Sequence, residues 1–246
     1  MAGFFVVFEG GDGVGKTTQV ERLAGRLRAP AGGGFEVVTT REPGGTDLGK
    51  ELRQAIMHGN HVAPRAEALL YAADRAHHIH TKVRPALERG AVVVQDRYVD
   101  SSIVYQGGAR GLGDEVERIS RWATEGLVPH LTIVLDMAPA KGRLERELDR
   151  VERETAEHGA LIRQAFLDLA AREPARYAVI DAARTIEEVE ADVAAAVSAA
   201  MEAAQVGTAD ARVRLASTSP EQLRTEPFST EPLRTEPLRT EPWGTP

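Results

Sequence analysis

The chain has 246 residues, no cysteine and a formal net charge of −7, which suits one sizeable α/β domain and excludes disulfides, thiolate metal sites and a cysteine nucleophile. No apolar run approaches the ~20 residues that span a bilayer and no signal segment comes first, so we predict a soluble, cytoplasmic protein without a membrane partner. Residues 206–246 hold five basic and six acidic side chains, which leaves a net charge of −6 on the rest of the chain and argues against nucleic acid as a partner.

The first predicted element is a buried strand over the apolar run Phe4–Phe8. A glycine-rich turn follows, and apolar residues at helical spacing come after it. Gly10, Gly15, Lys16 and Thr17 fit the phosphate-loop pattern, in which backbone N–H groups and a helix N-terminus wrap a polyphosphate. In that pattern the lysine neutralises the outer phosphates and the threonine hydroxyl binds Mg²⁺. The alternative, a glycine turn without a ligand, explains neither the lysine nor the threonine, so we predict binding of a nucleoside triphosphate.

Four further apolar runs without alternation predict strands at 35–40, 91–96, 131–136 and 177–181. Between them, apolar residues at helical spacing predict helices around 79–87, 161–169 and 186–204. Strands that alternate with helices indicate an α/β fold with a five-stranded parallel sheet and helices on both faces. Ligands of such sheets bind at the carboxyl ends of the strands, where Gly10, Arg41, Asp96 and Asp136 fall.

The end of the chain has a different character. The pentapeptide LRTEP at 223–227 is followed by FSTEP, LRTEP and LRTEP. A proline in every repeat forbids a continuing helix, and few apolar groups can be buried. We therefore predict a folded domain over residues 1–205 and a disordered tail over 206–246. A partner-binding segment is the less favoured interpretation of the tail.

Three clusters lie where a second substrate would bind: TREPGGT at 40–46, LLYAADRAHH at 69–78 and VVVQDRYVDSSIVYQGG at 92–108. In the third, Asp96 ends a strand and is expected to be the second protein ligand of Mg²⁺. Arg97 follows it and would lie beside the phosphates. Each cluster alone is also typical of a surface turn or a structural ion pair, but their order after a phosphate loop favours a kinase site.

Three histidines in the second cluster resemble a metal site. His77, His78 and His80 do not all face one point on a helix. We therefore interpret them as exposed helix residues and not as ligands.

With these motifs in order, the chain resembles the thymidylate kinase family from Phe4 to about Ala204. The resemblance implies a P-loop NTPase three-layer fold with a short lid, and transfer of the γ-phosphoryl group of ATP to dTMP for dTTP synthesis. It also implies Mg²⁺ as cofactor, ATP and dTMP as the ligands, and a cytoplasmic homodimer.

The resemblance also implies a role for each matching residue. The ATP phosphates would be held by Gly10, Gly11, Asp12, Gly13, Val14, Gly15, Lys16, Thr17 and Thr18. The dTMP site would consist of Asp12, Arg41, Tyr71, Arg75, Arg97, Ser101, Tyr105 and Gln106. Within it, Asp12 would bind the 3′-hydroxyl, and Arg41 and Arg97 would bind the acceptor phosphate. Tyr71 would stack on thymine, Arg75 and Ser101 would bind the base edge, and Tyr105 would crowd the 2′ position. Mg²⁺ would be held by Thr17 and Asp96, and the catalytic groups would include Lys16, Arg97 and Asp12.

The resemblance places a lid at about 142–154. Some family members carry a catalytic arginine in the phosphate loop, where this chain has Gly13, and members with glycine there place basic residues in the lid. Arg146 and Arg150 would then be catalytic contacts of the γ-phosphate, and Arg143 would lie beside adenine.

Other functions fit less well. A regulatory GTPase would carry an Asn-Lys-x-Asp motif, which the chain does not have. A kinase for another nucleoside monophosphate is the nearer alternative. A nucleotide-binding module without activity would require a defective lid.

Overall fold

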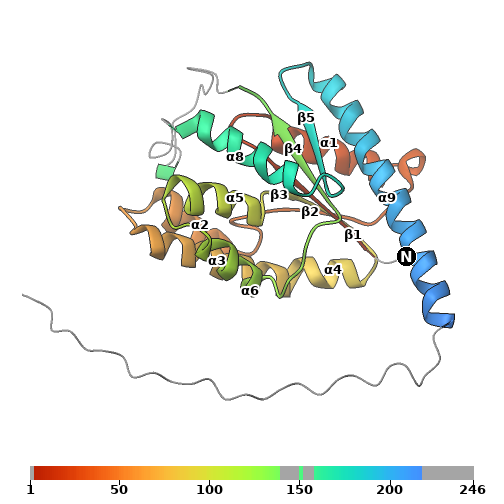
Figure 1. The fold of residues 1–246 in the computed structure, drawn as a ribbon, viewed down its shortest axis with the longest axis horizontal. Helices are drawn as coiled ribbons and strands as arrows, with labels where there is room; N and C mark the ends of the chain where they lie inside the picture. Colours follow the sequence, from red (N-terminus) through yellow and green to blue (C-terminus); the bar gives the residue numbers. More distant parts are fainter. Residues whose placement is uncertain (1–2, 139–149, 152–157, 218–246) are drawn as a thin grey trace, which may run out of the picture. The chain divides into compact units, whose positions relative to one another are not determined.

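The computed structural model describes residues 3–138, 150–151 and 158–217, with side chains up to residue 204. One parallel five-stranded sheet has the strand order β2-β3-β1-β4-β5 (Figure 1). The strands are β1 (Phe4–Glu9), β2 (Val37–Arg41), β3 (Val92–Asp96), β4 (Leu131–Asp136) and β5 (Tyr177–Asp181). This confirms the predicted fold class, and the last two strands have the predicted bounds.

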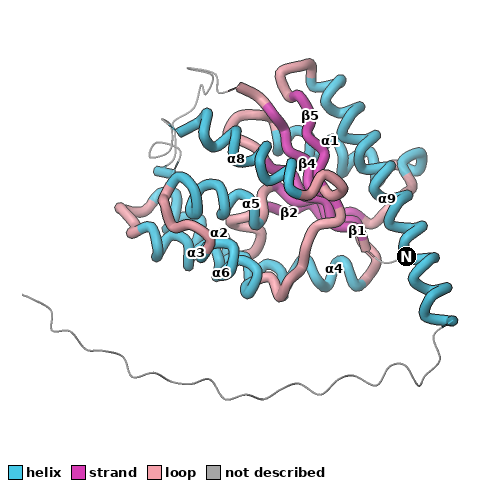
Figure 2. The backbone as a smooth tube through the Cα atoms, viewed as in Figure 1, coloured by secondary structure: helices cyan, strands magenta, loops and turns pink. Residues whose placement is uncertain are grey.

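Helices surround the sheet (Figure 2). They are α1 (Lys16–Arg28), η1 (Pro30–Gly32), α2 (Asp47–His58), α3 (Pro64–His78), η2 (Ile79–Val83), α4 (Arg84–Glu88), α5 (Val99–Ser102), η3 (Ile103–Ala109), α6 (Glu115–Ala123), α8 (Gly159–Arg172) and α9 (Ile186–Ser217). Segments η2 and η3 are π-helical, so the predicted helix around 79–87 is a π-helical turn that continues into α4.

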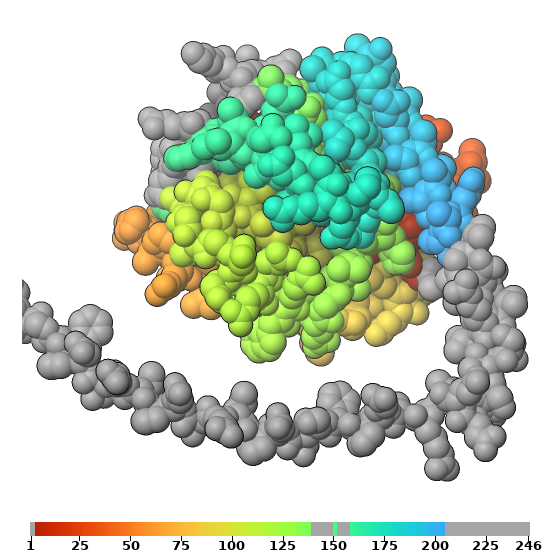
Figure 3. Space-filling model, in the orientation of Figure 1, coloured from red at the N-terminus to blue at the C-terminus, as the bar shows by residue number. Residues whose placement is uncertain are grey.

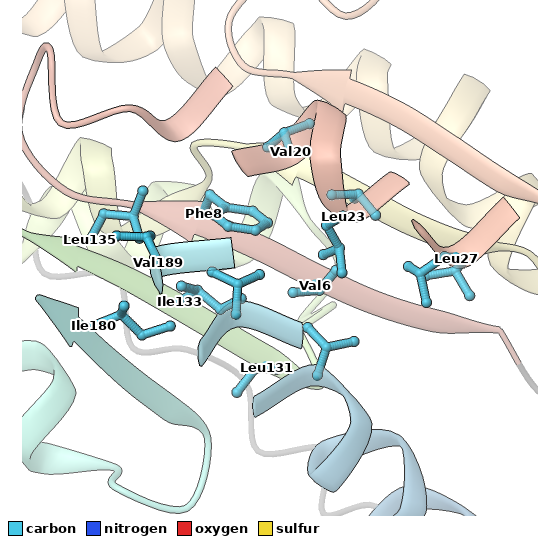
Figure 4. Packing of buried hydrophobic residues seen from close by; sticks show 14 of the residues in the cluster. Val6, Phe8, Val20, Leu23, Leu27, Leu131, Ile133, Leu135, Ile180 and Val189 are labelled. Atoms are coloured by element: carbon cyan, nitrogen blue, oxygen red, sulfur yellow. The ribbon is translucent and has the colours of Figure 1, made fainter. Parts of the chain in front are cut away.

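Strand β1 is the centre of the sheet, and its side chains alternate between two apolar layers. Phe4, Val6 and Phe8 pack against apolar residues of α1 and α9 (Figure 4). Phe5 and Val7 pack on the other face with residues of η2 and α4. Because both faces are covered, the strand is an unbroken apolar run in the sequence.

A third apolar cluster joins η3, β4 and α8, and its members include Val104, Tyr105, Val134 and Phe166. Figure 3 shows the surface of α8 beside that of the residues that follow β3. Tyr105 contacts Phe166 edge to face, with ring centroids 6.4 Å apart. Segment η3, which carries the predicted acceptor residues Tyr105 and Gln106, is therefore packed against β4 and α8.

The register of the sheet brings three strand ends together. Asp96 is paired with Phe8 of β1 and with Arg41 of β2. The turns after β1, β2 and β3 therefore start at the same edge of the sheet. Arg97 and Gly10 meet there, although they are 87 positions apart in the sequence. This edge carries most of the predicted site.

Residues Met1–Gln205 form one compact unit. The disordered tail over 206–246 stays a prediction. Helix α9 continues to Ser217, beyond its predicted end at 204. The physical reason is that the first proline after the helix is Pro220, so nothing at 205–217 forbids helical backbone. The repeats themselves, and most of the predicted lid, lie outside the described residues. Among the residues that the structure describes, no helix is long and apolar enough to cross a bilayer.

Candidate active site

The turn between β1 and α1 requires glycine at two positions for different reasons. A Cβ on Gly10 would lie 2.5 Å from the carbonyl oxygen of Leu135 in β4, so the close approach of the two strands excludes a side chain. Gly15 has a φ of 93°, a left-handed conformation that glycine adopts without strain. It is the N-cap of α1 and carries no side chain that could bind the first N–H groups of the helix. These N–H groups are suited to bind an anion.

Lys16 crosses the turn from the first position of α1. Its Nζ donates to the carbonyl oxygens of Gly10, at 3.1 Å, and Gly11, at 2.5 Å. Burial, and after it the nearby charge of Arg97, lower the pKa of Lys16 to about 8. A phosphate in the turn would supply the anionic partner that stabilises this ammonium.

Two side chains at the strand edge fit a magnesium ion. The Thr17 hydroxyl donates to Oδ2 of Asp96 at 3.0 Å. The other carboxylate oxygen of Asp96 is buried and has no hydrogen-bond partner among the described residues. Hydroxyl and carboxylate oxygens are the ligands that Mg²⁺ prefers, with phosphate and water oxygens completing its shell. In the part of the chain that the structure describes, no group of three or more acidic or histidine side chains could hold a metal ion.

Arg97 lies directly after β3 and extends over the phosphate turn. One of its terminal nitrogens, Nη1, donates to the Gly10 carbonyl at 3.2 Å and to the Ser101 hydroxyl at 2.8 Å. The other forms an ion pair with Asp12, whose side chain is 31% exposed. A cation is thus held at the border between the turn and the acceptor clusters.

Asp12 is also bound from the acceptor side. The Tyr105 hydroxyl donates to its Oδ2 at 3.1 Å, and burial raises the pKa of Tyr105, which keeps that hydroxyl protonated. Burial also acts to raise the pKa of Asp12, but the charges of Arg97 and Lys16 outweigh it, and the net pKa is lowered. Asp12 is therefore an ionised carboxylate between two cations and a phenol.

A cavity opens beside this group. The predicted residues among its lining side chains are Asp12, Tyr71, Arg75, Arg97, Ser101, Tyr105 and Gln106. Pro43, Met57 and Val151 add apolar surface. A mostly apolar cavity with a few convergent polar groups is typical of a small-molecule site, so the structure brings together residues from all three acceptor clusters.

Arg41 is exposed at the end of β2. It is paired in register with Asp96 and is not among the side chains that line the cavity. Its contact with an acceptor phosphate stays a prediction.

Arg75 lines the cavity, and its contact with the base edge stays a prediction. It is 2% exposed, and its guanidinium donates to Glu42, Ser120, Ser102 and the carbonyl of Tyr98. It borders the cavity, but these four hydrogen bonds use most of its N–H groups for contacts within the protein. Its main role in the structure is to join α3 to the turn after β2 and to α5.

Gln106 and Ser101 also have partners inside the protein. Gln106 donates to Glu67 at 3.0 Å, and the Ser101 hydroxyl lies between Glu9 and Arg97. Their predicted contacts with the acceptor stay predictions.

Arg150 lies in the interior in this structure, and its contact with the γ-phosphate stays a prediction. Its Nη2 forms a 2.5 Å ion pair with Glu67, and its Nε donates to the carbonyl of Ile56 at 2.9 Å. The guanidinium is buried and bound to α2 and α3. A buried carboxylate attracts a cation strongly because little water competes for it. Arg143 and Arg146 lie outside the described residues.

The histidine interpretation was wrong for His78, which is buried, while His77 is half-buried and His80 exposed. The two ring nitrogens of His78 lie 2.7 Å from the Thr40 hydroxyl and 2.8 Å from Glu42. Glu42 thus binds both His78 and Arg75. This buried network fixes the turn after β2 on α3.

Sequence reasoning missed four buried carboxylates: Glu9, Glu42, Glu67 and Asp74. Each is at most 4% exposed. The signal for Glu9 was a charged residue directly after an apolar strand. Glu67 had a weaker signal, a single acidic residue before the apolar positions of α3. Their partners lie far away in the sequence, and no local pattern identifies them.

Comparisons with known proteins agree with this geometry. Residues 8–193 match the family described as thymidylate kinase. Thymidylate kinase of Clavibacter michiganensis subsp. michiganensis is 54% identical over 200 residues, which cover 78% of this chain and 93% of that protein. Thymidylate kinase of Deinococcus radiodurans is 47% identical over 203 residues, which cover 80% and 97%. The crystal structure of thymidylate kinase from Ehrlichia chaffeensis is similar with a TM-score of 0.67 at 28% identity, covering 80% of this chain and 100% of that one.

Proposed function

This chain belongs to the thymidylate kinase family, and on that premise we propose that it transfers the γ-phosphoryl group of ATP to dTMP, giving dTDP and ADP for dTTP synthesis. One observation carries the proposal beyond family membership. Asp12, Arg97 and Tyr105 form a hydrogen-bonded group that lines a cavity next to the phosphate turn. A nucleoside monophosphate in that cavity would have its phosphate next to the γ-phosphate of ATP.

The donor is held by the turn from Gly10 to Thr18. Backbone N–H groups and the start of α1 bind its phosphates, and Lys16 neutralises charge on the β- and γ-phosphates. Thr17 and Asp96 would hold Mg²⁺, which would neutralise further charge on the transferring group. Arg146 over the γ-phosphate and Arg143 beside adenine stay proposals from the family resemblance.

The acceptor is held by groups from three turns. Asp12 binds the sugar 3′-hydroxyl, because it is an ionised acceptor at the cavity wall. Arg97, with Arg41 at the strand edge, binds the acceptor phosphate. Tyr71 offers its ring to the base. The acceptor phosphate oxygen is already anionic, so transfer needs alignment and charge stabilisation and no general base.

The test of the function is product formation with ATP and each of dTMP, UMP, CMP and AMP in turn. ADP release and the diphosphate product are measured together, so that hydrolysis of ATP by itself is recognised. We expect dTMP to give the highest kcat/KM. A clear preference for UMP or CMP would overturn the specificity and leave the fold and the reaction class unchanged.

Selectivity for the deoxy sugar is expected to depend on the ring of Tyr105. A 2′-hydroxyl pressed against that ring would be left without a partner, which costs about 1–3 kcal/mol. Replacing Tyr105 with alanine should therefore narrow the preference for dTMP over its ribose analogue by roughly ten-fold or more. The measurement is the ratio of the two kcat/KM values.

Tyr105→Phe is the matched control. It keeps the ring and removes only the hydroxyl that donates to Asp12, so overall activity falls while the ratio stays near that of the unsubstituted chain. A ratio unchanged in the alanine variant would place the selectivity elsewhere.

We further propose that the chain acts as a homodimer in the cytoplasm, as the family resemblance implies. Leu48 of α2 is 42% exposed, Leu69 of α3 is 56% exposed and Trp122 of α6 is 82% exposed. Helix α2 packs beside α3, and α3 beside α6. Large apolar side chains exposed on adjoining helices support contact with a second copy.

A further inference from the structure

Glu9 ends β1 with a carboxylate that is fully buried at the edge of the sheet. Its Oε1 accepts hydrogen bonds from the backbone N–H groups of Tyr98, at 2.8 Å, and Ser101, at 3.2 Å. Its Oε2 lies 2.6 Å from the Ser101 hydroxyl, which donates to it. All three donors belong to the segment that follows Arg97.

The backbone of Arg97 requires such support. Its φ of 67° lies in the left-handed region, where the Cβ of a non-glycine residue is strained. The N–H of Arg97 donates to the Phe8 carbonyl at 2.9 Å, and the next N–H, that of Tyr98, donates to Glu9. The end of β1 therefore holds the strained residue by two successive N–H groups.

The side chain of Arg97 is oriented by the same carboxylate. Ser101 donates its only hydroxyl proton to Glu9, so its oxygen faces Arg97 as an acceptor, at 2.8 Å from Nη1. The guanidinium is then directed toward Asp12. Glu9 thus acts on Arg97 through both the backbone and a hydroxyl relay.

We infer that Glu9 is a positioning residue that sets the conformation of Arg97 and the direction of its guanidinium toward the acceptor phosphate. The inference rests on the proposed function in that Arg97 binds the phosphate of the acceptor. Glu9 touches neither substrate. Its effect on catalysis passes through Arg97.

Three charged groups act on Glu9. Arg97 after β3 and Lys16 in α1 are cations near it, and Asp100 in α5 is an anion. Tyr177 of β5 donates to Asp100 at 2.7 Å. Burial, followed by the charge of Asp100, raises the pKa of Glu9 to about 7.

The raised pKa of Glu9 allows a test of whether Glu9 positions Arg97 or stabilises the fold. The folded-state value lies above the ordinary 4.5, so Glu9 favours folding while protonated and loses that contribution as the pH rises through its folded pKa. Glutamine has no proton to lose. We therefore expect Glu9→Gln to have a Tm at or above that of the unsubstituted chain at about pH 8, and the difference to shrink at about pH 5.5.

The kinetic test uses Glu9→Gln with ATP and whichever of dTMP, UMP, CMP and AMP the unsubstituted chain phosphorylates best. A different acceptor would revise the proposed function and leave the test of Glu9 intact. The amide nitrogen of the glutamine cannot accept a hydrogen bond from the Ser101 hydroxyl. Glu9→Gln therefore breaks the link from residue 9 through Ser101 to Arg97. We expect kcat/KM for the acceptor to fall about 10- to 100-fold, while KM for ATP changes less than about three-fold.

Tyr177→Phe is the matched control, because it removes a partly buried hydrogen bond to Asp100 and contacts neither Glu9 nor Arg97. It should keep kcat/KM within about two-fold of the unsubstituted value. The decisive comparison is Glu9→Gln in the Arg97→Met background. Because Glu9 acts through Arg97, it should lower kcat/KM there by less than about two-fold.

An equal loss in both backgrounds would overturn the inference, since Glu9 would then act by another route. So would a fall in Tm at about pH 8 together with a rise of both KM values, because that pattern indicates a general loss of structure.

Discussion

Replacing Lys16 with alanine is expected to lower kcat about 10²- to 10³-fold, the range seen when one preorganised charge-stabilising group is removed from an active site. Lys16 is the cation that the phosphate turn itself supplies, and its ammonium lies within 3.1 Å of two backbone carbonyls of that turn. No other side chain of residues 10–18 carries a positive charge that could neutralise the transferring phosphoryl group. The measurement is kcat at saturating ATP and acceptor.

Lys16→Met is the control for packing, because it keeps most of the aliphatic stem and removes the charge. Burial lowers the pKa of Lys16, so the ammonium costs folding free energy and Lys16→Met should not have a lower Tm at neutral pH. Near-normal turnover in both variants would refute the assignment of the phosphate turn.

Replacing Arg97 with methionine is the second large effect. We expect kcat/KM for the acceptor to fall about 10²- to 10³-fold, since a charge held by three groups in a partly buried site is lost where two polyanions must meet. Asp12, released from Arg97, would also repel the incoming phosphate. KM for ATP should change much less, because the turn and Lys16 still bind the donor.

Arg97→Lys tests whether charge alone is sufficient. A lysine keeps the charge but has no planar fork that could reach Gly10, Ser101 and Asp12 together. It should recover only part of the loss. Full recovery would show that Arg97 acts as a point charge and that its orientation by Glu9 has no kinetic consequence.

The buried position of Arg150 bears on which cation is expected to neutralise charge on the transferring phosphoryl group. Arg150 is bound to Glu67 in the interior, so its replacement should disturb packing between α2 and α3 and not remove a charge from the γ-phosphate. Among the described residues, Lys16 and Arg97 are the cations that contact the phosphate turn. The lid contribution is left to Arg143 and Arg146.

The sequence by itself determined the parts of this protein that depend on neighbouring residues. The apolar runs at 131–136 and 177–181 form strands with the predicted bounds. A strand that is buried on both faces is a continuous apolar run in the sequence, which can be recognised locally. The phosphate turn was equally readable, since Gly10, Gly15, Lys16 and Thr17 act within one strand-turn-helix unit. The predicted α/β class follows from the order of such units.

Only the tertiary structure decided what the charged side chains do. Glu9 binds a turn 89 to 92 residues away, and Arg150 binds a carboxylate 83 residues away. His78 and Arg75 look like exposed or ligand-binding residues on their own helix, yet both bind Glu42 across the fold. A charged group that leaves water must find its partner in space, and spatial proximity between distant segments is set by the sheet order and the packing of the helices. The role of an ionisable residue therefore depends on the whole fold, whereas a strand or a phosphate turn is encoded in the few residues that form it.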